Sequence, residues 1–128
     1  MNSQAVGKRG EDYARELLRE MGHTVVAANV SSPYGEVDII TSDKQHICFV
    51  EVKARKRGSM VSGTQAVSLS KQRKIIATAL WYLQRHPCDL QPRFDVVSII
   101  LNESGQPLSH DYLTGAFDGE AYERYADF

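Results

Sequence analysis

The chain has 128 residues, of which 42% are hydrophobic and 24% charged, values that are ordinary for one folded domain. We therefore expect residues 1–128 to form a single domain, with a core over about 7–101 and an acidic C-terminal tail over 102–128. No apolar run approaches the roughly 20 residues of a membrane-spanning helix, and the N-terminus lacks the apolar centre of a secretory signal. We expect a cytoplasmic protein with no membrane partner.

The charges are unevenly distributed, although the net charge is only −1. The segment from Lys53 to Lys74 contains lysine and arginine but no acid, whereas the charged residues after Asn102 are six acids and one arginine. A basic segment of this kind is typical of a surface that contacts phosphates. A solvated loop with no ligand explains the same charges, and charge alone favours the two interpretations equally. The two cysteines and four histidines show no zinc-ligand spacing, which argues against a zinc site.

Residues 5–22 have the periodicity of an amphipathic helix that ends at Gly22. Its apolar stripe is formed by Ala14, Leu17, Leu18 and Met21. Glu11 lies off this stripe and one turn before Arg15. Periodicity alone therefore predicts that Glu11 forms a surface ion pair worth a few tenths of a kcal/mol.

A β-hairpin is predicted for Gly35–Lys53, after a first strand over His23–Asn29 and a turn over Val30–Tyr34. Two β-branched runs flank the polar residues 43–46, which we take as the loop. Ser42 then pairs with Ile47.

This register places Asp38 opposite Glu51 and Glu36 opposite Lys53, on one face of the hairpin. Directly opposed carboxylates repel each other, and a divalent cation between them would reverse the sign of the interaction. A register slip of one residue would scatter the cluster over both faces.

The second hairpin strand is apolar on both faces, which predicts a central strand that is covered on each side. Glu51 and Lys53 at the end of such a strand are costly to bury unless they are paired or bind a ligand. We therefore favour a functional role for both residues over a plain salt bridge.

A loop over Arg55–Leu69 follows, and its basic start is Arg55, Lys56 and Arg57. Ser70 is the predicted N-cap of a second helix that ends at His86, with a buried stripe formed by Gln72, Ile76, Ala79, Leu80 and Leu83. Lys71 and Lys74 share one face near the helix start, where cations oppose the helix dipole. Their position indicates that an anion lies nearby. Trp81 and Tyr82 are expected to be packing residues.

The last clear strand is predicted over Arg93–Leu101, and we favour a structural role for Asp95 near its start. A turn over 102–107, a short edge strand over Leu108–Leu113 and an acidic helix over Asp118–Tyr125 complete the chain. The predicted order is αβββαβ plus a tail, an α/β fold whose mixed central sheet is flanked by helices.

Asp38, followed by Glu51-Val52-Lys53 on the next strand, resembles the PD-(D/E)XK nuclease core. The chain is similar in particular to the YraN-like family of small bacterial proteins, which resemble archaeal Holliday-junction resolvases. The matching segments are Gly7–Glu11 with Ala14, Gly35–Ile40, Phe49–Arg55, Lys71 with Ala79, Arg93–Val97 and, more weakly, Gly115–Phe117. Val37 stands where the superfamily has its proline, and Ser31 stands where the family usually has an arginine, two residues after Asn29.

The resemblance implies a restriction-endonuclease-like fold with Mg²⁺ or Mn²⁺ as cofactor. The metal ligands would be Asp38, Glu51 and the backbone carbonyl of Val52, with Lys53 acting on the attacking water. Glu11 would complete the catalytic site or hold a second ion. The nucleic-acid backbone would be bound by Arg55, Lys56, Arg57, Lys71 and Lys74.

Three hypotheses remain open at this point. The leading one is a metal-dependent endonuclease that hydrolyses DNA phosphodiester bonds, with branched DNA among its candidate substrates and a homodimer as a candidate assembly. The second is a nucleic-acid-binding module that retains the nuclease fold without turnover. The third is a structural or partner-docking domain in which Asp38 and Lys53 take part only in ion pairs.

Overall fold

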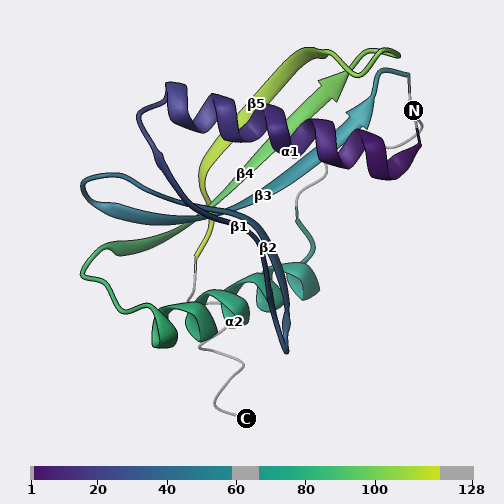
Figure 1. Ribbon diagram of the computed structural model, residues 1–128. Coiled ribbons are helices and arrows are strands. Elements are labelled where there is room, and N and C mark those ends of the chain that lie inside the picture. Colours follow the sequence, from purple (N-terminus) through teal and green to yellow (C-terminus); the bar gives the residue numbers. More distant parts are fainter. Residues whose placement is uncertain (1, 59–66, 119–128) are drawn as a thin grey trace.

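The computed structural model describes residues 2–58 and 67–118, which form a five-stranded mixed sheet and two helices (Figure 1). In chain order the elements are α1 (Ser3–Glu20), β1 (Thr24–Ser32), β2 (Gly35–Ser42), β3 (His46–Lys56), α2 (Leu69–Arg85), β4 (Gln91–Leu101) and β5 (Pro107–Phe117). The predicted α/β class and the order αβββαβ are confirmed, and the edge strand predicted after them is present as β5. Neither helix in the described ranges is long and apolar enough to cross a membrane.

The strands lie side by side in sequence order, from β1 at one edge to β5 at the other. Neighbouring strands are antiparallel except β3 and β4, which are parallel because the chain crosses over through α2. Helix α1 covers one face of the sheet and α2 the other (Figure 1).

Strand β3 is the predicted central strand, and its side chains alternate between two apolar clusters. Ile47 and Phe49 pack on the α2 side, where Phe49 meets Tyr82 edge-on at 6.3 Å between ring centroids. Cys48 and Val50 pack on the α1 side. Burial on both faces leaves little room for polar side chains, which makes Glu51 on this strand exceptional.

Helix α1 begins with Asn2 as its N-cap, whose side chain accepts a hydrogen bond from the amide of Ala5 at 2.8 Å. Ala14 and Leu18 are fully buried, as predicted. Met21, predicted to belong to the apolar stripe, is 46% exposed because it is already the C-cap. Gly22 follows with φ 93°, the left-handed conformation expected after a helix.

Helix α2 begins two residues earlier than predicted, because Ser68 rather than Ser70 is its N-cap. The hydroxyl of Ser68 accepts a hydrogen bond from the amide of Lys71 at 3.2 Å. Its buried face is also rotated from the predicted stripe, and Leu80 is 46% exposed. Thr78 is buried in its place, since its hydroxyl bonds that of Ser32 on β1 at 2.7 Å.

Two strand boundaries differ from those predicted. Strand β1 continues to Ser32 and turns through residues 33–34, because Ser31 and Ser32 pair with Glu36 and Gly35 of β2. Strand β3 continues to Lys56, so Arg55 and Lys56 belong to the sheet rather than to the following loop. The rest of that loop, residues 59–66, lies outside the described residues.

The segment predicted as an acidic tail contains strand β5, which is longer than the expected edge strand over 108–113. Most of its side chains are exposed, so the sequence carries little hydrophobic alternation there. Phe117 anchors its end by stacking on Phe94 at 5.1 Å between ring centroids. The predicted helix over Asp118–Tyr125 lies outside the described residues except for Asp118.

Gly10 allows α1 to approach β3 closely. A Cβ atom at Gly10 would lie 2.3 Å from the Cβ of Ala54 on β3, a separation that side chains do not tolerate. This contact brings the neighbouring Glu11 toward the sheet.

We predict that Gly10→Ala lowers the free energy of unfolding by about 1–3 kcal/mol, because the added methyl group forces α1 away from β3. Gly7→Ala is the matched control, since a Cβ at Gly7 meets nothing within 4 Å. Because Gly7 is exposed and helical, Gly7→Ala should raise the free energy of unfolding by about 0.5–1 kcal/mol. Urea denaturation of the two variants measures both effects, and equal stabilities would contradict the close approach.

Candidate functional site

The predicted hairpin register is confirmed from Ser42↔Ile47 to Ile39↔Val50. Beyond Ile39 the ladder is replaced by a side-chain contact, in which Asp38 Oδ2 accepts a hydrogen bond from the backbone N–H of Val52 at 2.7 Å. The ladder ends one step before Asp38 and Glu51, so their predicted pairing lies just beyond it, and the two carboxyl groups are neighbours as predicted. The Asp38 carboxylate is directed toward the backbone of β3 where the two strands separate.

A local change in side-chain alternation accounts for this geometry. Val37 and Ile40 are three residues apart, yet both pack in the α2-side cluster, while Ile39 packs on the α1 side. Strict alternation would put Val37 and Ile40 on opposite faces, so the strand is irregular around Asp38. Glu36, which we expected opposite Lys53, lies beyond the end of the β2–β3 ladder. On its other side it pairs with Ser31 of β1, whose hydroxyl donates to Glu36 Oε1 at 3.3 Å.

Glu51 is buried at the α2 side of β3, with 9% of its surface exposed. Its Oε1 atom lies 3.7 Å from the ammonium nitrogen of Lys71, which comes from the first turn of α2. Its Oε2 atom is buried and has no hydrogen-bond partner within the described residues. Lys71 was predicted as a phosphate contact, and the structure places it against a carboxylate of the candidate site.

Asp38 and Glu51 form an electrostatically coupled pair. Burial raises the pKa of Asp38, and the hydrogen bond from Val52 opposes that shift. Burial and the neighbouring Asp38 charge raise the pKa of Glu51 to about 7, whereas Lys71 lowers it. Because these neighbouring carboxyl groups repel each other when both are ionised, the pair favours a state in which one of them keeps its proton. A pair that retains a proton near neutral pH is one in which a cation could replace that proton.

Glu11 reaches the same region from α1. It is half-buried, and its pKa is raised first by burial and next by the charge of Asp38. Periodicity predicted that Glu11 forms a surface ion pair with Arg15. This prediction is wrong, because Arg15 forms its ion pair with Asp12. The carboxamide of Asn29 on β1 faces the Glu11 carboxylate. We assigned Asn29 no role from the sequence. Its tolerance of left-handed backbone was the one available signal that it occupies a special position.

The cations of the basic segment lie at different places around the carboxylates. Lys53 and Arg55 follow Glu51 at intervals of two residues along β3. Strand alternation therefore puts all three side chains on the same face of the strand. Arg57 lies in the exposed turn after β3, and Lys56 is the last residue of the strand. Lys74 packs its stem beside Gly35 at the β1–β2 turn.

The donor set fits a hard divalent cation in its chemistry. Across residues 2–58 and 67–118, no group of three or more His, Cys, Asp or Glu side chains is arranged to hold a metal ion. Mg²⁺, however, usually takes one or two carboxylates and keeps several waters. The buried, unpartnered Oε2 of Glu51 beside Asp38 supplies such a ligand pair.

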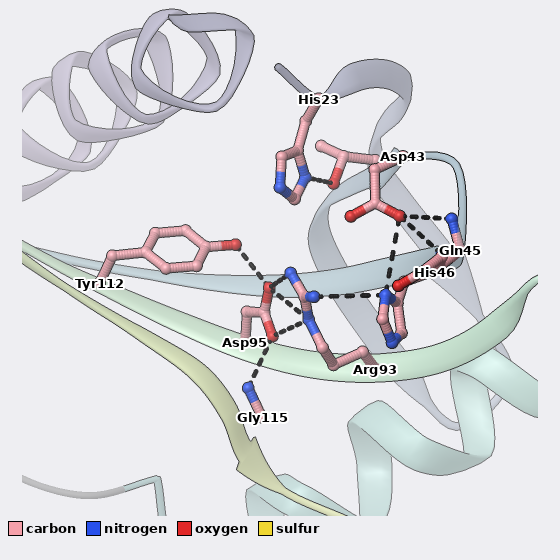
Figure 2. Close-up of polar contacts among 9 residues, drawn as sticks. His23, Asp43, Gln45, His46, Arg93, Asp95, Tyr112 and Gly115 are labelled. Carbon is pink, nitrogen blue, oxygen red and sulfur yellow. Dashed lines mark hydrogen bonds and ion pairs between the residues drawn. The ribbon is translucent and has the colours of Figure 1, made fainter. Parts of the chain in front are cut away.

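Asp95 on β4 shows the contrasting case of a fully satisfied buried carboxylate (Figure 2). Arg93 donates to Asp95 Oδ2 at 2.9 Å, the hydroxyl of Tyr112 donates to the same atom at 2.6 Å, and the Gly115 amide donates to Oδ1 at 2.9 Å. These contacts connect β4 to β5. They support the structural role that we favoured for Asp95.

We predict that Glu51→Gln stabilises the metal-free protein above neutral pH. The pKa of Glu51 rises from 4.5 to about 7 on folding, so the folded state binds more protons than the unfolded chain between these values. Stability therefore falls as pH rises through that window. The glutamine variant should gain on the order of 2 kcal/mol of unfolding free energy near pH 8 and little near pH 4.

The exposed Glu16→Gln is the control and should leave the pH dependence unchanged. Denaturation at several pH values makes the comparison. A loss of stability in Glu51→Gln near pH 8 would instead show that the Lys71 ion pair dominates, as the structural hypothesis requires.

The sequence matches the family described as Uncharacterised protein family UPF0102 over residues 10–99. Similar proteins carry the same family name. One from Desulfosudis oleivorans is 40% identical over 116 residues, covering 90% of this chain and 91% of its own. One from Dictyoglomus thermophilum is 37% identical over 118 residues, covering 91% of this chain and 100% of its own. A third, from Syntrophotalea carbinolica, is 38% identical over 119 residues, covering 92% of this chain and 95% of its own.

These matches agree with the resemblance to the YraN-like family. The chain belongs to the UPF0102 family.

Proposed function

We propose that this protein is a Mg²⁺- or Mn²⁺-dependent endonuclease that hydrolyses DNA phosphodiester bonds. One observation carries the proposal, namely the half-buried Asp38 beside the buried Glu51, whose Oε2 atom has no hydrogen-bond partner within the described residues. Two adjacent buried carboxylates destabilise a fold unless a proton or a cation lies between them. A phosphodiesterase needs such a pair to hold its metal ion.

The architecture supports a PD-(D/E)XK core. An antiparallel hairpin supplies Asp38 from β2, and Glu51 and Lys53 from β3. The first helix brings Glu11 near Asp38. The crossover helix α2 supplies Lys71.

The residues of the chain would divide the chemistry among them. Asp38, Glu51 and the carbonyl of Val52 would hold the cation, which when bound would polarise the phosphate and lower the pKa of a water. Lys53, two residues from Glu51, would orient the attacking water or accept its proton. Glu11 would fix the position of a further water beside Asp38. The Asp38 carboxylate is already oriented for this task by the N–H of Val52.

Asp38→Asn should abolish Mg²⁺- or Mn²⁺-dependent cleavage, lowering the rate by about 10³-fold or more, because it removes a charged metal ligand. Asparagine keeps an oxygen that can accept the Val52 N–H, so folding and DNA affinity should remain close to those of the wild type. Cleavage is measured on duplex, flap, four-way-junction and single-stranded DNA, with Glu16→Gln as the control. Equal cleavage by the wild type and Asp38→Asn would refute the proposal.

A nucleic-acid-binding module without turnover is the second candidate function. The ion pair of Lys71 with Glu51 Oε1 favours it, because a cation of the chain itself then offsets the Glu51 charge. It predicts salt-sensitive binding and no metal-dependent cleavage of any of the four substrates.

Both candidates predict that exposed cations of the basic segment bind phosphates. Arg57→Gln and Lys74→Gln should each weaken DNA binding at every sequence and reduce the slope of log K against log salt by about 0.9 on duplex DNA. Arg19→Gln, an exposed change near the C-terminal end of α1, is the control. Fluorescence anisotropy titrations at several salt concentrations measure the slopes, and unchanged slopes in the two variants would exclude this surface.

A further inference from the structure

Asn29 has a backbone conformation that is unusual for a residue inside a strand. It is the only non-glycine residue with positive φ in residues 2–58 and 67–118, at φ 52°. Left-handed backbone is unfavourable for residues with a side chain and is least so for asparagine and aspartate. Such strain persists where the surrounding structure enforces it and is frequent at functional sites.

Asn29 lies beside Asp38 in the sheet. Its neighbours Ala28 and Val30 pair with Ile39 and Val37, which flank Asp38 on β2. Strand β1 is irregular around Asn29, as β2 is around Asp38. Ala27 and Val30 both pack on the α2 side, although regular alternation would place them on opposite faces.

This irregularity directs the Asn29 side chain toward α1. Alternation counted from Ala27 would place Asn29 on the α2 face, yet its carboxamide faces Glu11 of α1. With its NH₂ group turned to the carboxylate, the amide nitrogen lies 3.2 Å from both Oε1 and Oε2 of Glu11. A carboxylate can only accept hydrogen bonds, so this orientation of the amide satisfies both groups.

We propose that Asn29 is a positioning residue, whose left-handed backbone aims its amide at Glu11 and so holds that carboxylate beside Asp38. The catalytic consequence rests on the proposed function, whereas the contact itself does not. Glu11 stands on a helix surface with three rotatable side-chain bonds. Burial and the charge of Asp38 both disfavour its ionised form there, and the hydrogen bond from Asn29 opposes them.

Three substitutions separate the backbone role of Asn29 from its amide role. Glycine permits positive φ and removes the amide. Aspartate tolerates positive φ but replaces the donor with a charge that faces Glu11, and alanine lacks both properties. If the amide holds Glu11, stability near pH 8 falls in the order wild type, Asn29→Gly, Asn29→Asp. If only the backbone matters, Asn29→Gly and Asn29→Asp both match the wild type, and only Asn29→Ala is weakened.

A double-mutant cycle of Asn29→Gly with Glu11→Ala tests the contact without any activity. We expect the effects on the folding equilibrium constant to be non-additive by about fivefold, as for residues in direct contact. Additive effects, or Asn29→Asp as stable as Asn29→Gly, would overturn the inference.

Mn²⁺ binding, followed by electron paramagnetic resonance, and cleavage supply the functional measurements. Asn29→Gly should weaken Mn²⁺ binding or lower kcat by about 10- to 100-fold, as loss of an outer-shell partner does, with KM for DNA unchanged. A rise in KM alone would overturn the positioning role. If the wild type cleaves no DNA, the proposed function fails, and the cycle and the Mn²⁺ titration still decide the role of Asn29.

Discussion

The hydrogen bond from the Val52 amide to Asp38 is the interaction on which the candidate site depends. Where β2 separates from β3, an amide of a central strand loses its ladder partner and must find another acceptor. Asp38 supplies it from within the plane of the sheet. A carboxylate in that plane can interact with both faces. The charge of Asp38 accordingly raises the pKa of Glu11 on α1, and Lys71 on α2 lowers the pKa of Asp38.

The regular parts of this arrangement could be predicted from sequence. The register of Ser42 with Ile47 follows from two apolar runs around a short polar break, and the burial of Phe49 and Val50 follows from apolar residues on both faces. The orientation of Asp38 could not be predicted. Arguments from strand period assume unbroken alternation, and here the alternation changes next to a left-handed residue on the neighbouring strand.

Tertiary contacts decide the remaining positions. Glu11 is off the apolar stripe of α1, and it is half-buried because Gly10 lets the helix approach Ala54. The α2 N-cap at Ser68 sets the position of the first turn, from which the exposed Lys71 reaches Glu51. Helical periodicity contains no information on how closely α1 approaches the sheet, so it placed Glu11 on the surface. The position of Lys71 at the helix start indicated a nearby anion but could not identify that anion as Glu51. Only the family resemblance indicated that Glu11 belongs to the site.

Comparison of the two buried acids argues that the site is adapted to a ligand. Asp95 receives hydrogen bonds from Arg93, Tyr112 and Gly115, so this fold can satisfy a buried carboxylate completely. Glu51 is buried to a similar degree, yet one of its oxygens lacks a donor in the described structure and its neighbour is another acid. A purely structural role would be served better by an apolar residue or a full set of donors. A proton or a cation between the two carboxylates would remove the energetic cost of this pair.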